Sequence, residues 1–334
     1  MAGFDDLLNF MFRAVDVAPR YEAERCIVVS RSSRTACSAC HDACPHDAVR
    51  ITNRVAIDPV DCSGCGLCVR ACPSGALEAN TAYAGGAAIR CSQVAGSVQS
   101  VQCLAKLGAT DVLRLAGLSG KATLARGACA GCKIGSAAVP AAVDRVVAEA
   151  RQLAAVVGRE LEVEVRQTAR LDEYEPGERL SRRRLLGGGV RGVKHAASDA
   201  LAPLERILPA PEVAPRHADL PEEHARRLAL LAAAAPESET LVPFRLPRVA
   251  DGCIMCPLCT KACPTDAISR DLSAEVGVLK VDPQRCVGCD ACVPACPVGV
   301  IAMDDAVTWG ELKAGPYEAF VATPERRAQG SFHR

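Results

Sequence analysis

Three stretches of the chain place four cysteines at the spacing CxxCxxCxxxCP, and no other feature restricts the fold as strongly. The twelve cysteines are Cys62, Cys65, Cys68 and Cys72; Cys253, Cys256, Cys259 and Cys263; and Cys286, Cys289, Cys292 and Cys296. A fourth stretch keeps the last three positions, at Cys37, Cys40 and Cys44. Three thiolates on a tight loop can hold one face of an iron–sulfur cube, while the fourth, turned away by the proline, reaches a second cube. The spacing therefore predicts pairs of 4Fe-4S sites that share their cysteine sets.

The 20 cysteines of the 334-residue chain fall into three islands, at residues 26–72, 91–132 and 253–296, which hold eight, four and eight of them. The first and third islands resemble each other, because each contains two cysteine sets and each set ends in Cys-Pro. The chain therefore contains an internal repeat at two levels, the set and the pair of sets.

The composition excludes several classes of protein. Lys and Arg total 39 and Asp and Glu total 39, so no net positive charge favours binding to nucleic acid. No run of 18 apolar residues occurs, and the N-terminal segment, with Asp5, Asp6 and Asp16, lacks the pattern of a secretory signal. We therefore expect a cytoplasmic protein without a membrane span. Because the cytoplasm keeps disulfides reduced, the cysteines are expected to bind metal.

On these motifs, the first and third islands resemble bacterial-type ferredoxin domains that hold two 4Fe-4S clusters each. The resemblance implies four clusters and assigns their ligands by position. In the third island it implies one site from Cys253, Cys256, Cys259 and Cys296, and another from Cys286, Cys289, Cys292 and Cys263. In the first island it implies one site from Cys62, Cys65, Cys68 and Cys44, and it leaves Cys37, Cys40 and Cys72 for the other.

The incomplete set needs a fourth ligand, and here the chain departs from the ferredoxin pattern. The position three residues before Cys37 is Arg34, which cannot bind iron. The nearest upstream cysteine is Cys26, separated from Cys37 by ten residues. We predict that Cys26 is the missing ligand; a three-iron cluster or an empty site are the alternatives. Residues 37–41 also match the CxxCH of haem attachment, but Cys44-Pro45 follows at ferredoxin spacing.

Structural zinc is the alternative for these sixteen cysteines, since pairs of CxxC also bind zinc. A zinc site uses two pairs for each ion. It has no need for a third cysteine two residues further on, or for the proline that follows each set. The pattern therefore favours iron–sulfur clusters.

The second island, with Cys91, Cys103, Cys129 and Cys132, accounts for the remaining four cysteines. It resembles the thioredoxin-like 2Fe-2S ferredoxins and, more faintly, the iron–sulfur subunit that links hydrogenase to heterodisulfide reductase. Strand-like segments end at Cys91 and Cys103, so the four thiols are expected to converge at strand ends. A 2Fe-2S cluster, a zinc ion, and a redox-active dithiol at Cys129 and Cys132, where CAGC is predicted to open a helix, are the three interpretations.

We expect an α+β fold in which two ferredoxin-like 4Fe-4S dicluster domains flank a small α/β thioredoxin-like module. The predicted boundaries are 1–80 for the N-terminal dicluster domain, 84–166 for the α/β module, 167–247 for an Arg- and Pro-rich connector, 248–306 for the C-terminal dicluster domain and 307–334 for a tail. Strands are expected at 48–51, 87–90, 100–102, 122–125, 161–165 and 298–302, and helices at 111–116, 138–157, 193–208 and 222–235.

Other patterns in the connector have simpler interpretations. The triplet Gly187, Gly189 and Gly192 matches GxGxxG, but no hydrophobic strand precedes it, so a flexible turn is expected. Arg182 and Arg183 are expected in a solvated basic loop, with docking to an acidic partner surface as the alternative. His217 and His224 are expected to face solvent.

The favoured function is electron transfer by a polyferredoxin-like relay subunit of a larger oxidoreductase complex. The sequence contains no nucleophile–base grouping, so we expect an electron carrier without substrate chemistry of its own. The expected partners are donor and acceptor oxidoreductases. The alternative function is an accessory or assembly factor for a metallo-oxidoreductase.

Overall fold

The computed structural model describes residues 17–29, 36–52, 54–79, 86–169, 219–272 and 276–322. These residues belong to one unit of the chain. The helix expected at 193–208 lies outside them, as do the GxGxxG triplet and the pair Arg182 and Arg183. All 20 cysteines lie within the described residues, and all are free thiols.

The N-terminal module consists of two-stranded sheets joined by loops that carry cysteines. Strand β1 (Arg20–Tyr21) pairs with β4 (Leu77–Glu78), and β2 (Val49–Ile51) pairs with β3 (Val55–Ile57), both in antiparallel fashion. The connecting helices are η1 (Ala23–Arg25), η2 (Ile27–Val29), α2 (Ala39–Asp42) and α3 (Leu67–Ala71). Cys26, Cys40 and Cys68 are buried in the same core as Val49 and Leu77. The thiols are therefore part of the core.

The C-terminal module repeats this plan with longer strands. Strand β9 (Leu246–Val249) pairs with β12 (Ile301–Asp304), as β1 pairs with β4. Strand β10 (Ile268–Asp271) pairs with β11 (Gly277–Val281), as β2 pairs with β3. The short helices α9 (Leu258–Ala262) and α10 (Cys292–Ala295) carry cysteines, as α2 and α3 do. The repeat in the sequence is thus also a repeat of structure.

Each Cys-Pro corner turns the chain in the same way. The residue three positions after the cysteine has a positive φ at all four corners: 51° at Asp47, 64° at Gly75, 54° at Asp266 and 67° at Gly299. Glycine adopts this left-handed conformation freely, and aspartate adopts it more readily than most side chains. Each turn leads directly into a strand, which is β2, β4, β10 or β12 in turn.

The C-terminal module extends beyond both of its predicted boundaries. Strand β9 begins at Leu246, inside the predicted connector. The predicted tail contains helix α11 (Trp309–Lys313), which begins with reciprocal hydrogen bonds between Thr308 and Glu311, and strand β13 (Tyr317–Ala322). Strand β13 pairs with β11 and buries Phe320, so it completes a three-stranded sheet. No strand was predicted in this segment, because it is short and contains no cysteine.

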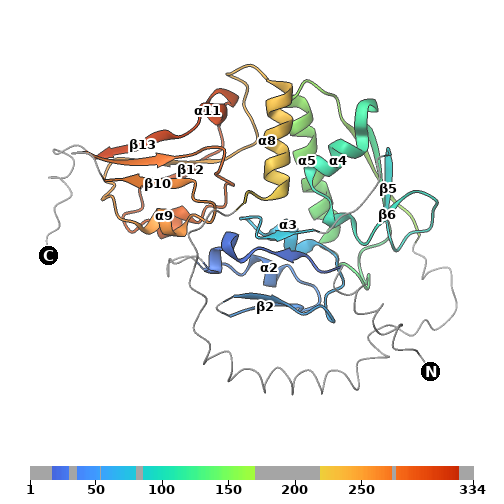
Figure 1. Ribbon diagram of the computed structural model, residues 1–334. Coiled ribbons are helices and arrows are strands. Elements are labelled where there is room, and N and C mark those ends of the chain that lie inside the picture. The colour runs from blue at the N-terminus through green and yellow to red at the C-terminus, as the bar shows by residue number, and fades with distance from the viewer. Residues whose placement is uncertain are drawn as a thin grey trace. The chain divides into compact units, whose positions relative to one another are not determined.

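The middle module contains a parallel sheet with helices packed on it (Figure 1). Its strands are β5 (Ala88–Cys91), β6 (Ser100–Val101), β7 (Lys121–Arg126) and β8 (Glu162–Gln167), in the order β6-β5-β7-β8. Its helices are η3 (Leu104–Lys106), α4 (Ala109–Ala116), η4 (Gly117–Ser119) and α5 (Val139–Val156). The strands and the two α-helices expected here lie within two residues of their predicted bounds. Every strand pairing in this described sheet is parallel, and the likeness to thioredoxin remains a prediction.

Helix α8 (Glu222–Ala234) lies beside α5 (Figure 1), and its first two turns make polar contacts with the middle module. Glu223 accepts hydrogen bonds from the backbone and the hydroxyl of Thr110, at 3.1 and 2.5 Å. Arg227 bridges Glu223 and Glu149. Burial alone would raise the pKa of Glu223, but the Arg227 guanidinium and the Thr110 hydrogen bonds hold it below its usual range. The helix is thus anchored by a half-buried network of charges.

The same helix also contacts both cysteine-rich modules. The Glu222 backbone donates to the Glu78 carboxylate at 3.0 Å. His224 donates from Nε2 to the Gln284 carbonyl at 2.8 Å. His224 is only 9% exposed, and burial lowers its pKa. The expectation that His224 faces solvent was therefore wrong, because its ring is packed edge-on against Phe244.

Replacing Arg227 with methionine is expected to destabilise the protein, because it leaves the desolvated Glu223 carboxylate with only the more distant Arg226, at 3.5 Å, as its cation. We expect a loss of about 1–3 kcal/mol, the range for a partly buried ion pair. The midpoint of thermal unfolding, followed by circular dichroism, should fall by roughly 2–12 °C. The matched control is Lys121→Met, since the Lys121–Glu162 pair is largely exposed and should contribute almost nothing. An equal fall of the unfolding midpoint in the two variants would contradict a stabilising role for the Arg227–Glu223 ion pair.

Candidate iron–sulfur centres

The structure gathers the cysteines of the N-terminal module into two groups of four thiols. One group, here called the Cys62 site, consists of Cys44, Cys62, Cys65 and Cys68. Burial raises the pKa of Cys68, and the neighbouring thiolates of Cys65, Cys62 and Cys44 raise it further. A thiol that is both buried and surrounded by other thiols stays protonated unless a metal binds it. These four thiols would therefore need a bound metal in order to ionise together.

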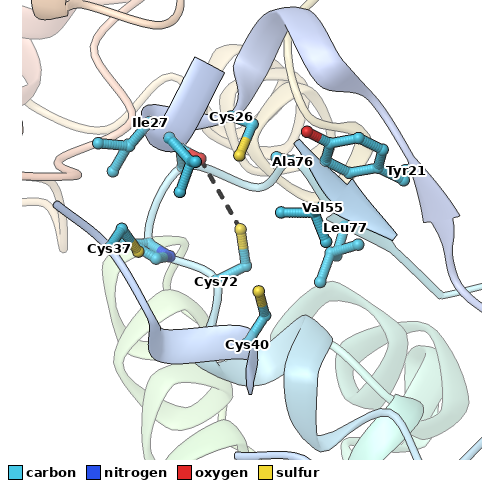
Figure 2. Close-up of a pocket in the computed structure, with 12 residues that line it drawn as sticks. Tyr21, Cys26, Ile27, Cys37, Cys40, Val55, Cys72, Ala76 and Leu77 are labelled. Carbon is cyan, nitrogen blue, oxygen red and sulfur yellow. Dashed lines mark hydrogen bonds between the residues drawn. The ribbon is translucent and has the colours of Figure 1, made fainter. Parts of the chain in front are cut away.

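The other group, the Cys26 site, consists of Cys26, Cys37, Cys40 and Cys72, and these four thiols line one pocket (Figure 2). Figure 2 shows the sulfurs of Cys26, Cys40 and Cys72 directed into the same space. Burial raises the pKa of Cys40 to about 11, and the thiolates of Cys72, Cys37 and Cys26 contribute to the rise. The structure therefore brings Cys26 to the three cysteines that lack a fourth partner.

The backbone explains why Cys26 reaches this pocket despite its separation from Cys37 in the sequence. Strand β1 pairs with β4, and the next amide, that of Glu22, donates to the Ala76 carbonyl at 2.8 Å. In the C-terminal module, β9 pairs with β12, and the Ala250 amide donates to the Val300 carbonyl at 2.9 Å. Cys26 follows the first of these strands and Cys253 follows the second. Cys26 thus occupies the place in the N-terminal module that Cys253 occupies in the C-terminal one.

The C-terminal module also forms two groups. The Cys286 site consists of Cys263, Cys286, Cys289 and Cys292. Burial raises the pKa of Cys286 to about 11 and that of Cys289 to about 12, and the Cys263 thiolate adds to both rises. The Cys253 site consists of Cys253, Cys256, Cys259 and Cys296. The pKa of Cys253 is raised by burial and by the thiolates of Cys256 and Cys296.

Backbone amides near these cysteines point at the sulfurs. The amide two residues after a cysteine donates to its sulfur in five cases, which are Gly64 to Cys62, Leu67 to Cys65, Met255 to Cys253, Gly288 to Cys286 and Ala291 to Cys289. Each of these hydrogen bonds lowers the pKa of the thiol against the effect of burial. Such donors stabilise the negative charge of thiolates and of the sulfurs of a bound cluster. The donor set therefore fits thiolate-ligated clusters.

The Cys91 site consists of Cys91, Cys103, Cys129 and Cys132 and lies at one edge of the parallel sheet. Cys91 ends β5, Cys103 follows β6, and the other two follow β7. Parallel neighbours end at the same edge of a sheet, and the crevice beyond their carboxyl ends is the usual place for a ligand. Burial raises the pKa of Cys103 to about 12, and the thiolates of Cys65, Cys91 and Cys129 contribute. The Cys103 thiol therefore lies near those of Cys91 and Cys129, and the Cys129 thiol lies near that of Cys132, while a cofactor shared by these four residues remains a prediction.

The CAGC segment does not open a helix, contrary to the sequence-based expectation. It forms a turn in which the Cys132 amide donates to the Cys129 carbonyl at 3.2 Å. Helix α5 begins only at Val139, with Pro140 in its first turn. A helix N-terminus, a nearby cation or the CxxC motif itself can lower the pKa of a redox-active thiol. Here the helix N-terminus is missing, and burial raises the pKa of Cys129 while the Arg126 guanidinium lowers it.

Two neighbours of the cysteines were missed by the sequence analysis. Tyr21 lines the pocket of the Cys26 site, and Lys106 is buried between cysteines of two different modules. The signal for Lys106 is its position as a lone charge in the otherwise apolar segment 103–109. No pattern marked Tyr21, because its place depends on the β1–β4 pairing.

Comparison with known proteins identifies two parts of the chain. The family of 4Fe-4S dicluster domains matches residues 33–76 and 252–300. These matches support duplicated dicluster ferredoxin domains and a role in electron transfer. No curated protein and no solved structure matched the chain. The matched residues leave the middle module unassigned.

No described helix is long and apolar enough to cross a membrane. Among the described residues, no group of three or more His, Cys, Asp or Glu side chains has the arrangement of a site for a metal ion.

Replacing Cys26 with serine is expected to damage one cluster only. The anaerobically prepared protein should lose about one iron if a three-iron cluster remains, or about four if the Cys26 site empties. Iron analysis and electron paramagnetic resonance of the oxidised protein distinguish these results. Val28→Ala is the matched control, since Val28 lines the same pocket without a thiol. An unchanged iron content in Cys26→Ser would show that Cys26 is not a ligand.

Proposed function

We propose that this protein is a multi-cluster electron relay, a subunit that passes single electrons between a donor and an acceptor oxidoreductase. The observation that carries the proposal is the gathering of sixteen cysteines into four buried or half-buried groups of four thiols, within two modules of the same plan. The Cys26, Cys62, Cys253 and Cys286 sites would each hold a 4Fe-4S cluster. Such a cluster, when bound, accepts and releases one electron.

The side chains and amides around each site support fast transfer with little rearrangement. Cys40, Cys68, Cys259 and Cys292 sit on short helices, so their sulfurs have little freedom to move when the charge changes. Buried neighbours such as Val49 and Leu77 keep water from the Cys26 site. Amides such as those of Gly64 and Gly288 point at sulfurs before any electron arrives. The protein environment is therefore preorganised for a negative charge.

Partial exposure of several ligands provides routes for electrons to enter and leave. Cys37 and Cys44 in the N-terminal module, and Cys253 and Cys256 in the C-terminal module, are only partly buried. Val298, two residues beyond Cys296, is 41% exposed and offers apolar contact area beside the Cys253 site. Both cysteine-rich modules would thus present cofactor sites near the surface. We place no substrate chemistry on the protein itself, and we expect it to act in the cytoplasm.

Anaerobic purification with iron and acid-labile sulfide analysis tests this proposal. Four cubes require about 16 irons, and a 2Fe-2S cluster in the Cys91 site raises the number to about 18. The clusters should be reduced by dithionite and reoxidised without loss of iron. A value near eight irons would leave one module empty and overturn the relay. Release of iron to an apo-oxidoreductase would support an assembly factor instead.

Double replacement of Cys129 and Cys132 with alanine tests the cofactor of the Cys91 site. We expect a loss of about two irons and retention of about 16, because the other four sites share no cysteine with this one. Metal analysis of the wild-type and variant proteins makes the measurement. Loss of about one zinc with no loss of iron would assign the site to zinc. Matched replacement of Ser136, near the same loop but without a thiol, should leave the metal content unchanged.

A further inference from the structure

The Cys62 and Cys91 sites belong to different modules, yet they share one interface. Cys65 is buried in the same core as Cys91 and Cys103. The Ile134 carbonyl, two residues after Cys132, accepts hydrogen bonds from the Ser63 hydroxyl at 2.6 Å and from Nε2 of His46 at 2.9 Å. The loops that hold the two sites are thus joined directly.

Lys106 lies at this interface, and its position is fixed by close packing against the backbone. It ends helix η3, which begins one residue after Cys103. A Cβ atom on Gly66 would lie 2.8 Å from Cγ of Lys106 and 2.9 Å from its Cα. Gly66 has a φ of 83°, so glycine is required there both for its backbone conformation and for this approach. The lysine stem is therefore held against the residue that follows Cys65.

The Lys106 side chain is unusually buried for an ammonium group. The residue is 5% exposed, and Nζ donates to the Val17 carbonyl at 3.4 Å. Removing an ammonium from water is costly unless negative charge lies nearby. Burial lowers the pKa of Lys106, and the thiolates of Cys62, Cys103, Cys65 and Cys68, which belong to both sites, act against that shift. Once a bound cofactor keeps these cysteines as thiolates, ligands on both sides of Lys106 would balance its charge.

We propose that Lys106 is a shared counter-charge that raises the reduction potentials of the cofactors in the Cys62 and Cys91 sites. This inference rests on the proposed function, because it concerns the clusters that those sites would hold. A thiolate-ligated cluster becomes more negative when it gains an electron, and a nearby fixed cation stabilises the reduced form more than the oxidised form. The effect is strong where water is excluded, because a low dielectric screens it little. Electrons would therefore collect on this pair of cofactors in preference to the other sites.

The test is a redox titration of the full-length, anaerobically prepared protein, followed by electron paramagnetic resonance. Lys106→Met removes the charge and keeps most of the stem. At a fixed solution potential, the ratio of reduced to oxidised cluster should fall at least tenfold for one or two of the couples, which corresponds to about 59 mV for one electron. The couples of the C-terminal module should not move. Lys106→Arg, which keeps the charge, should restore the wild-type values.

Two controls keep the result decisive. Lys121→Met removes a charge from the same module at an exposed position, and it should shift no couple. Lys106→Gln removes the charge but keeps a polar end, and it serves if the methionine variant fails to fold. Iron-replete Lys106→Gln or Lys106→Met with unchanged potentials would overturn the inference, as would an equal shift of all couples. The iron content is measured first, so a protein without four cubes would fail the proposed function before this test begins.

Discussion

The structure depends on the burial of thiols that cannot ionise by themselves. Nine of the 20 cysteines are buried, in a chain with only 3% aromatic residues. Burial and mutual repulsion raise the pKa of thiols such as Cys40, Cys68 and Cys289, so as free groups they stay protonated. Binding of metal to the thiolates would supply both the missing positive charge and the missing cross-links. Folding and cofactor binding are therefore expected to be one process in this protein.

Two different architectures bring four thiols together. In the ferredoxin-like modules, short antiparallel strand pairs return the chain so that two cysteine sets interlock, and each Cys-Pro corner uses the same left-handed turn. In the middle module, parallel strands end at one edge and deliver cysteines from three separate loops. The arrangement in the ferredoxin-like modules follows from the local spacing of the cysteines. The second arrangement depends on strand order, so its cysteines are spread widely in the sequence.

Helix α8 explains how a segment of the predicted connector becomes part of the fold. Its first two turns contact the N-terminal module through Glu222, the middle module through Glu223 and the C-terminal module through His224. These contacts are polar and partly buried, and they hold the helix in one register. An amphipathic helix is predictable at these residues, but the burial of His224 is not, because hydrophobic periodicity does not show which neighbour covers a helix face.

The sequence alone determined the local grouping of the cysteines. The CxxCxxCxxxCP spacing is short enough to place three thiols on one loop, and the proline marks where the chain turns the fourth thiol away. The strands and helices of the middle module were also predictable, because hydrophobic periodicity is local. Only the tertiary structure decided that Cys26 joins Cys37, Cys40 and Cys72, that β13 completes a sheet, and that Lys106 is buried beside two sets of thiols. Each of these depends on strand pairing or packing between residues far apart in the chain, and local sequence patterns do not determine which of those residues meet.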